Sequence, residues 1–110
     1  MSYNASHRFA RIAPRKARYI ADLIRGMDAS EALIQLQFSK RRAAAYYKSV
    51  LQSAIANAEE AEADVERLYV SACVADEGPT MKRFQPKDRS HAHPINKRTS
   101  HLHLPLDERD

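Results

Sequence analysis

The sequence predicts an α+β fold: three helices packed on one face of a small three-stranded antiparallel sheet, with a long protruding β-hairpin loop. Residues 14–60 hold three segments in which apolar residues recur every three or four positions, the period of a half-buried helix. Residues 68–75 and 101–106 instead alternate with the period of a half-buried strand. Between these strands lie the eighteen residues Pro79–Asn96, far more than the roughly two to five of an ordinary hairpin loop. We therefore interpret this loop as the functional part and the rest as its support.

The chain has 110 residues, near the usual size of one domain. We expect a single domain over residues 1–110, with a globular part at 5–78 and 97–106 and the extended hairpin loop at 79–96. The one cysteine, Cys73, cannot form an internal disulfide, and no apolar run approaches the roughly 20 residues that span a bilayer. The sequence thus predicts a cytoplasmic protein without membrane insertion.

The first strand and helix are predicted before residue 27. Residues 5–12 mix basic and apolar side chains without Gly or Pro, which favours a short edge strand. Pro14 suits the first position of a helix, and Gly26 is placed to end it. The apolar face of this helix is expected to hold Ala17, Ile20, Leu23 and Ile24.

Two further helices are predicted to follow. Asp28–Glu31 resembles a capping box, and the helix after it would bury Ala32, Leu33, Leu36 and Phe38. Ser39 is expected to cap a longer helix whose outer face changes from basic to acidic, the reverse of what the helix dipole favours. This reversal suggests that the basic end, with Lys40, Arg41, Arg42 and Lys48, meets a partner. The inner face is expected to hold Ala43, Ala44, Tyr47, Val50, Leu51, Ala54, Ile55 and Ala58.

The last two strands are expected to pair antiparallel beneath that helix. Their inward side chains would be Leu68, Val70, Ala72 and Val74 on one strand and Leu102, Leu104 and Leu106 on the other. Cys73 is out of phase with these positions and is interpreted as a small packed or semi-buried thiol, not a nucleophile. Pro105 cannot donate to a ladder, so it predicts a fraying or edge end of the last strand.

Basic residues gather in two segments. Residues 1–26 carry six Lys and Arg against one acid, and residues 79–104 carry six against Asp88 alone, whereas acidic clusters lie elsewhere. Such segregation indicates a two-faced molecule with a polyanionic partner on one side. Lys82-Arg83 and Lys97-Arg98 would lie opposite each other at the hairpin base, where like charges repel unless an anion lies among them. A solvated, disordered loop is the alternative for this composition.

No motif indicates catalysis, and we expect no cofactor, metal or enzymatic activity. The chain has only Gly26 and Gly78, so it offers no glycine-rich phosphate loop. His91-Ala92-His93 and His101-Leu102-His103 space two histidines as metal ligands can be spaced, but no cysteine and, apart from Asp88, no acid lies at ligand spacing. RNA-facing or polar histidines are the favoured interpretation.

Five blocks of the chain, in order, resemble one family. They read PRKAR at 14–18, ADLIRG at 21–26, SAIANAE at 53–59, DEGPTMKR at 76–83 and KRTSH at 97–101. This pattern resembles the bacterial large-subunit ribosomal protein numbered twenty-two in the universal nomenclature, over about residues 5–104. The resemblance implies a primary rRNA-binding protein whose globular part lies near the exit of the peptide tunnel and whose hairpin helps line the tunnel wall.

The resemblance and the charge pattern together give the expected sites. The partners would be large-subunit rRNA, neighbouring ribosomal proteins and the nascent peptide, with no homo-oligomer. The tunnel-facing tip would hold Arg89, Ser90, His91, Ala92 and His93. The residues expected to contact rRNA are Arg8, Arg11, Arg15, Lys16, Arg18, Arg25, Lys82, Arg83, Lys87, Arg89, Lys97, Arg98, Thr99, Ser100 and His101.

Three departures from the family pattern matter. Ala13 replaces the usual serine before Pro14, which removes a side-chain cap at a cost of about 1 kcal/mol. The tip carries Ser, His and Pro where the family is rich in Gly and Arg, so its charge depends on histidine protonation. Pro105 interrupts the usual β-branched strand. A DNA-binding helix-turn-helix protein is the alternative function, and it leaves the long loop unexplained.

Overall fold

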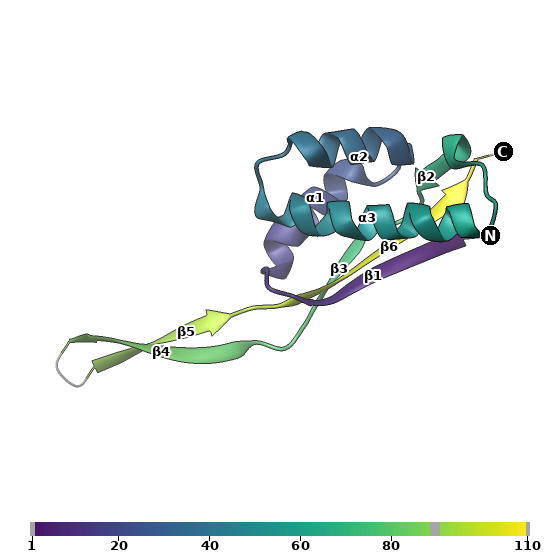
Figure 1. The fold of residues 1–110 in the computed structure, drawn as a ribbon. Helices are drawn as coiled ribbons and strands as arrows, with labels where there is room; N and C mark the ends of the chain where they lie inside the picture. Colours follow the sequence, from purple (N-terminus) through teal and green to yellow (C-terminus); the bar gives the residue numbers. More distant parts are fainter. Residues whose placement is uncertain (1, 89–90, 110) are drawn as a thin grey trace.

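The computed structural model describes residues 2–88 and 91–109, without the side chains of residues 82–96. Three helices lie over one face of the main sheet, and a hairpin extends away from it (Figure 1). The elements in chain order are β1 Ser2–Ala10, α1 Pro14–Ile24, α2 Ala29–Phe38, α3 Arg42–Glu60, a 3-10 turn Val65–Arg67, β2 Leu68–Val70, β3 Val74–Glu77, β4 Met81–Asp88, β5 His91–Lys97 and β6 Ser100–Glu108.

The predicted α+β class is confirmed, but the main sheet has four strands instead of three. β6 is central and antiparallel to all its neighbours, with β1 along one edge and β2 and β3 along the other. The fourth strand arises because the single strand predicted at 68–75 is interrupted at residues 71–73. β1 is an edge strand as predicted, although it spans Ser2–Ala10 and not residues 5–12.

The interruption between β2 and β3 changes which side chains face the core. Val70 pairs with Leu106 and Val74 pairs with His103, so this segment holds one residue more than β6 over the same interval. One extra residue turns the following side chains to the opposite face. Cys73 is therefore fully buried, as predicted for a packed thiol, whereas Val74 is 42% exposed and its predicted burial is wrong.

Pro105 lies within the central strand, so the prediction of an edge or fraying end is wrong. β6 continues to Glu108, and the carbonyl of Pro105 accepts bonds from the N–H and the hydroxyl of Ser71 at 3.3 and 3.2 Å. The N and O atoms of one strand residue face the same neighbour. The missing proline donor therefore faces the gap between β2 and β3, where the ladder is interrupted anyway.

The core lies between the sheet and α3, with α1 and α2 completing the helical layer. Leu102, Leu104 and Leu106 are fully buried as predicted, and the hydroxyl of buried Tyr47 donates to the carbonyl of Val74 at 3.2 Å. Leu23 and Phe38 were predicted to be buried and are exposed, Phe38 to 81%. The helices bury Ala17, Ile20, Ala21, Ile24, Ala29, Ala32, Leu36, Ala43, Ala44, Val50, Leu51, Ala54 and Ala58.

The helix ends differ in part from the predicted caps. Asp28 is the N-cap of α2, but its carboxylate accepts a bond from Nε of Arg109 at 2.9 Å and makes none to the helix. The N-cap of α3 is Arg41 and not Ser39, whose hydroxyl accepts from the Arg41 N–H at 3.3 Å. Gly26 follows α1 with φ +87°, as expected of a glycine that ends a helix.

The hairpin forms a separate two-stranded sheet of β4 and β5. Its register places Met81 opposite Lys97 and Lys82 opposite Asn96, so the two basic pairs both lie at its base but are offset, and the prediction that they lie directly opposite each other is wrong. The molecule measures 64 × 23 × 17 Å, and its radius of gyration of 16.9 Å exceeds the about 13 Å of a compact domain of this length. The hairpin accounts for this elongation (Figure 1).

Candidate nucleic-acid interface

Basic side chains surround a hollow of about 380 Å³ at the base of the hairpin. Arg11 comes from the connection after β1, Lys16 from α1 and Arg42 from α3. Lys97 ends β5 and Arg98 follows it, and none of the described residues that line the hollow is acidic. We call this site the cationic hollow. All of these cations are exposed to solvent and accessible to an anion such as a phosphate, and Arg98 also lies 3.9 Å from the exposed carboxylate of Glu77.

Two helix N-termini open on the cationic hollow. Ala13, the N-cap of α1, lines it together with the first residue of α3, Arg42. Neither helix has a side-chain cap bond or an acidic residue in its first turn. No first-turn acid therefore offsets the positive ends of the two helix dipoles, although the amides of Lys16 and Ala44 already donate to the carbonyls of Ala13 and Arg41, both at 3.1 Å. Backbone amides and cations together are the usual ligands of phosphate groups in proteins.

The hairpin base is fixed by close contacts around Thr99. Its hydroxyl donates to the carbonyl of Pro79 at 2.7 Å, and its carbonyl accepts from the Gly78 N–H at 2.9 Å. A Cβ atom at Gly78 would lie 2.5 Å from the Thr99 hydroxyl, so any other residue there would have to displace that hydroxyl. The buried hydroxyl of Ser100 donates to the carbonyl of Ile12 at 2.6 Å. These contacts hold Lys97 and Arg98 beside the start of α1.

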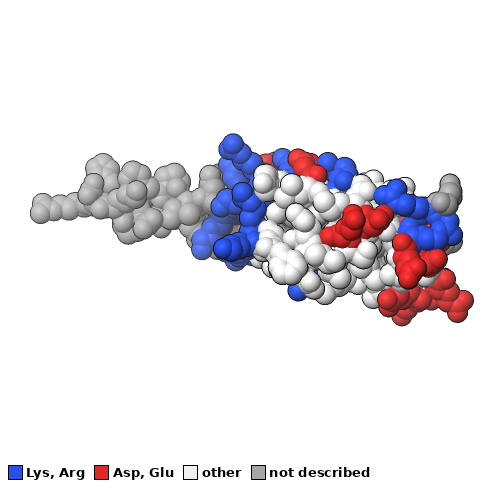
Figure 2. All heavy atoms as spheres, turned by 90° about the horizontal axis from the view of Figure 1, so that it is seen from above, with Lys and Arg blue, Asp and Glu red and all other residues white. Residues whose placement is uncertain are grey.

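Charge is distributed unevenly over the surface. Figure 2 shows Lys and Arg side chains gathered where the globular part meets the hairpin, while much of the visible acidic surface lies toward the opposite end. Glu59 and Glu60, at the end of α3, belong to the part of the molecule away from the hairpin (Figure 1). The basic side predicted from the sequence is therefore present at the hairpin base, while the opposite end carries both acidic and basic side chains (Figure 2).

Two of the predicted RNA-binding cations make internal contacts instead of lining the hollow. Nε of Arg18 donates to the carbonyl of Ala75 at 3.1 Å, and a terminal nitrogen of Arg25 donates to the carbonyl of Cys73 at 2.6 Å. Arg25 also pairs with Asp22 at 2.8 Å. These bonds tie β3 and the residue before it to α1, so both arginines have a structural role, and RNA contact by them stays a prediction.

The other predicted residues are dispersed. Arg15 is exposed on α1 outside the lining of the hollow, and Thr99 and Ser100 are buried and bonded within the protein. Arg8 and His101 lie beside Phe9. Lys82, Arg83 and Lys87 belong to β4 and His91, Ala92 and His93 to β5, with side chains outside the description; Arg89 and Ser90 lie outside the described residues.

Arg42 was not among the residues predicted to contact RNA, although it lines the cationic hollow. A neighbouring hollow of about 230 Å³ extends the same basic surface with Arg41, Arg42 and Lys16. The sequence pattern that pointed to Arg42 was the reversed charge along α3, in which cations lie at the N-terminal end, where the helix dipole is positive. Their place beside α1 and the hairpin depends on tertiary packing and could not be read from the sequence.

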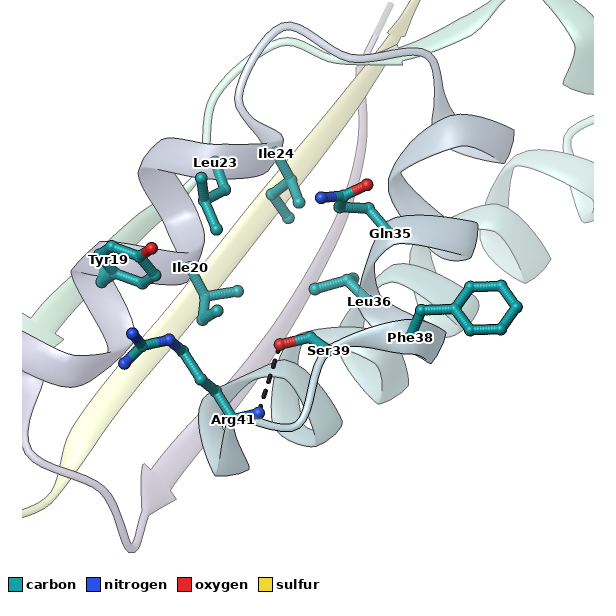
Figure 3. Close-up of a pocket in the computed structure, with 9 residues that line it drawn as sticks. All are labelled: Tyr19, Ile20, Leu23, Ile24, Gln35, Leu36, Phe38, Ser39 and Arg41. Atoms are coloured by element: carbon teal, nitrogen blue, oxygen red, sulfur yellow. Dashed lines mark hydrogen bonds between the residues drawn. The ribbon is translucent and has the colours of Figure 1, made fainter.

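A third hollow, of about 230 Å³ between α1 and α2, is lined by both apolar and polar side chains (Figure 3). At its rim the guanidinium of Arg41 lies 4.1 Å from the ring centroid of Tyr19. The ring of Phe38 points outward from the hollow. The Tyr19 ring positions Arg41 at the edge of the basic surface.

The three histidines whose side chains are described, His7, His101 and His103, contact other residues of the protein, and Cys73 is buried. The Ser6 hydroxyl lies 2.8 Å from Nδ1 of His103, and Nε2 of the same ring lies 3.5 Å from Asp76. No group of three potential metal ligands occurs among the described residues.

Burial raises the pKa of the Cys73 thiol to about 12, which keeps it protonated and unreactive at neutral pH. Within the described part, no helix has the length and apolar character needed to cross a bilayer.

Comparisons with known proteins agree with this arrangement. Residues 5–107 match the model of the family described as ribosomal protein L22p/L17e. The chain is 48% identical, over 110 residues, to the large ribosomal subunit protein uL22 of Lacticaseibacillus casei (strain BL23), with 99% of this chain and 94% of that protein covered. The same values hold for the uL22 protein of Lacticaseibacillus paracasei (strain ATCC 334). The chain therefore belongs to the ribosomal protein L22p/L17e family.

Proposed function

We propose that this protein is a structural constituent of the large ribosomal subunit in the cytoplasm and has no enzymatic role. It binds large-subunit rRNA through the cationic hollow and aids assembly of the subunit. The observation that carries the proposal is the convergence of both basic segments on one hollow. Arg11 and Lys16 come from the first segment, and Lys97 and Arg98 from the second. They are about eighty residues apart in the chain, so only the fold brings them together.

The chemistry of the hollow favours a phosphate backbone over a small anion. Its cations are spread over a surface that continues past Arg41, longer than one phosphate group requires. Guanidinium groups bind phosphate oxygens with two parallel hydrogen bonds, and the positive ends of the α1 and α3 dipoles, which no first-turn acid offsets, favour an anion at the same place. Such contacts fix the register of an RNA backbone without reading its sequence.

Salt dependence of binding tests this proposal. Replacing Arg42, Lys97 or Arg98 singly with alanine should reduce the slope of log affinity against log salt by about one unit or less for each phosphate that is no longer neutralised. The measurement is a titration of deproteinised large-subunit rRNA at several salt concentrations. Arg67→Ala is the matched control, because it removes one exposed cation that bonds the carbonyl of Arg109 near the C-terminus. Equal slopes for all four variants and the unaltered protein would contradict the proposed contacts.

The hairpin is the second part of the proposal. We infer that it passes between rRNA segments so that its tip, residues 89–93, meets the nascent peptide in the exit tunnel, while the globular part contacts neighbouring ribosomal proteins as a single copy. The length of 64 Å against a width of 23 Å supports a protruding arm, and family membership supports its direction.

Crosslinking tests the position of the tip. In a Cys73→Ala background, Ser90→Cys carrying a photoreactive group should crosslink to nascent chains on translating ribosomes. Ser30→Cys, on the exposed side of α2, should not. Equal labelling from both positions, or none from Ser90→Cys in assembled ribosomes, would contradict the tunnel placement.

A further inference from the structure

Phe9 combines an unfavourable backbone conformation with an exposed ring. Its φ of +58° lies in the left-handed region, which is strained for a residue that has a side chain. It lies in a bulge, where the register of β1 against β6 shifts between His7 and Ala10. The residue is 54% exposed, so burial in the core does not explain the conformation. Backbone strain held in place by its surroundings often marks a binding site.

Three contacts fix Phe9 at the surface. The backbone N–H of Phe9 donates to Nδ1 of His101 at 3.0 Å. The rings of Phe9 and His101 meet edge to face, with centroids 4.8 Å apart and planes at 88°. The guanidinium carbon of Arg8 lies 5.5 Å from the centre of the ring. His101 itself follows Ser100, whose buried hydroxyl is bonded to Ile12. The ring is therefore held in one orientation before any ligand arrives.

Phe9 also lies next to the cationic hollow along both strands that form the bulge. Arg11, which lines the hollow, is two residues further along the chain. Ala10 pairs with Ser100, which is two residues beyond Arg98. An RNA backbone bound in the hollow thus passes close to the ring. An aromatic ring beside cations is the arrangement by which proteins hold unpaired bases.

We propose that Phe9 is a stacking platform for one unpaired RNA base, with Arg8 as an adjacent cation. The proposal rests on the proposed function, because phosphates held in the cationic hollow bring the RNA to the ring. Every base has a π face, so stacking alone accepts any base and leaves its hydrogen-bonding edge free. The bulge gives Phe9 its strained φ and leaves the ring exposed to solvent.

Phe9→Gly separates stacking from folding. Glycine adopts a φ of +58° without strain, so this variant keeps the bulge and removes only the ring. Its affinity for deproteinised large-subunit rRNA should fall about tenfold, since stacking on an aromatic ring is worth about 1–3 kcal/mol per base. The salt slope should not change, and the melting temperature should stay equal or rise. Phe38→Ala, which removes another exposed ring, should bind as the unaltered protein does.

Fluorescence gives an independent readout. The chain has no tryptophan, so Phe9→Trp introduces a single indole at the platform and Phe38→Trp introduces one at the control position. Added rRNA should quench the emission of the Phe9→Trp variant and leave that of Phe38→Trp unchanged. Full affinity in Phe9→Gly, or unquenched emission from bound Phe9→Trp, overturns the platform. If the platform is overturned but Arg98→Ala still lowers the salt slope in the same titrations, the proposal of rRNA binding through the cationic hollow stands and only the stacking proposal is wrong. If the unaltered protein does not bind rRNA, both proposals are wrong.

Discussion

Gly78 and Thr99 show how single residues position the hairpin. A Cβ atom at Gly78 would lie 2.5 Å from the Thr99 hydroxyl and 3.3 Å from the Thr99 backbone. Gly78→Ala must therefore displace the hydroxyl that bonds Pro79. We expect a loss of about 1–3 kcal/mol in the free energy of unfolding, measured by denaturant titration. Thr99→Ala in the same chain removes the closest contact, so the double variant should lose less than the sum of the single variants. Strict additivity would contradict this account of the glycine.

The buried thiol of Cys73 should make the free energy of unfolding depend on pH in the alkaline range. Burial raises the pKa of its thiol to about 12, and burial also raises the pKa of Tyr47. An unfolded thiol loses its proton near pH 8.5, so above that pH the unfolded state binds fewer protons than the folded state. The free energy of unfolding should therefore be unaffected by these groups below about pH 8 and fall as the pH rises toward 11, by up to about 1.4 kcal/mol per pH unit for Cys73.

Denaturant midpoints between pH 7 and pH 11 measure this loss. Cys73→Ala should show a shallower decline over that range, because its contribution to proton binding is gone. An equally steep decline in this variant would assign the alkaline sensitivity to other groups.

Residue patterns predicted much of the core, because alternation and helical spacing depend on local geometry. The leucines of β6 and the alanine-rich face of α3 are buried as expected. Val74 was placed on the wrong face because a bulge is set by pairing with β6, and no local signal marks one extra residue. Asp28 had the sequence of a cap, but Arg109, far along the chain, bonds its carboxylate.

At the scale of elements, the N-terminus of α1 links stability and binding. Ala13 has the extended backbone of an N-cap but offers no acceptor. Ala13→Ser should raise the free energy of unfolding by about 1 kcal/mol, because its hydroxyl can accept from a first-turn amide. Ala45→Ser, on the exposed side of α3, is the control and should be neutral or slightly destabilising. Denaturant midpoints compare the two, and no gain in Ala13→Ser would mean that the α1 terminus already has another partner.

The candidate site was only partly predictable at this scale. The sequence located both basic segments, and the structure joins them through Arg11, Lys16, Lys97 and Arg98. The sequence could not show that Arg18 bonds β3 and Arg25 bonds Cys73 just before it, because these contacts depend on the packing of α1. The strain at Phe9 is likewise a property of the β1 bulge and has no signature in composition.

The whole molecule consists of a packed globular part and an arm that forms its own sheet. Replacing Phe84–Ile95 with a short turn should therefore leave the melting transition, followed by circular dichroism, nearly unchanged. Incorporation into large subunits or behaviour of the tunnel should suffer instead. A collapse of the melting transition would show that the arm stabilises the globular part.

Association with the large subunit tests the central claim most directly. The tagged protein, expressed in bacterial cells, is followed through a density gradient of their extract and then washed with moderate salt. We predict that it sediments with large subunits and resists removal, and that a variant lacking Arg42, Lys97 and Arg98 is released at lower salt because it neutralises fewer phosphates. Sedimentation of the unaltered protein away from ribosomal particles would contradict the account.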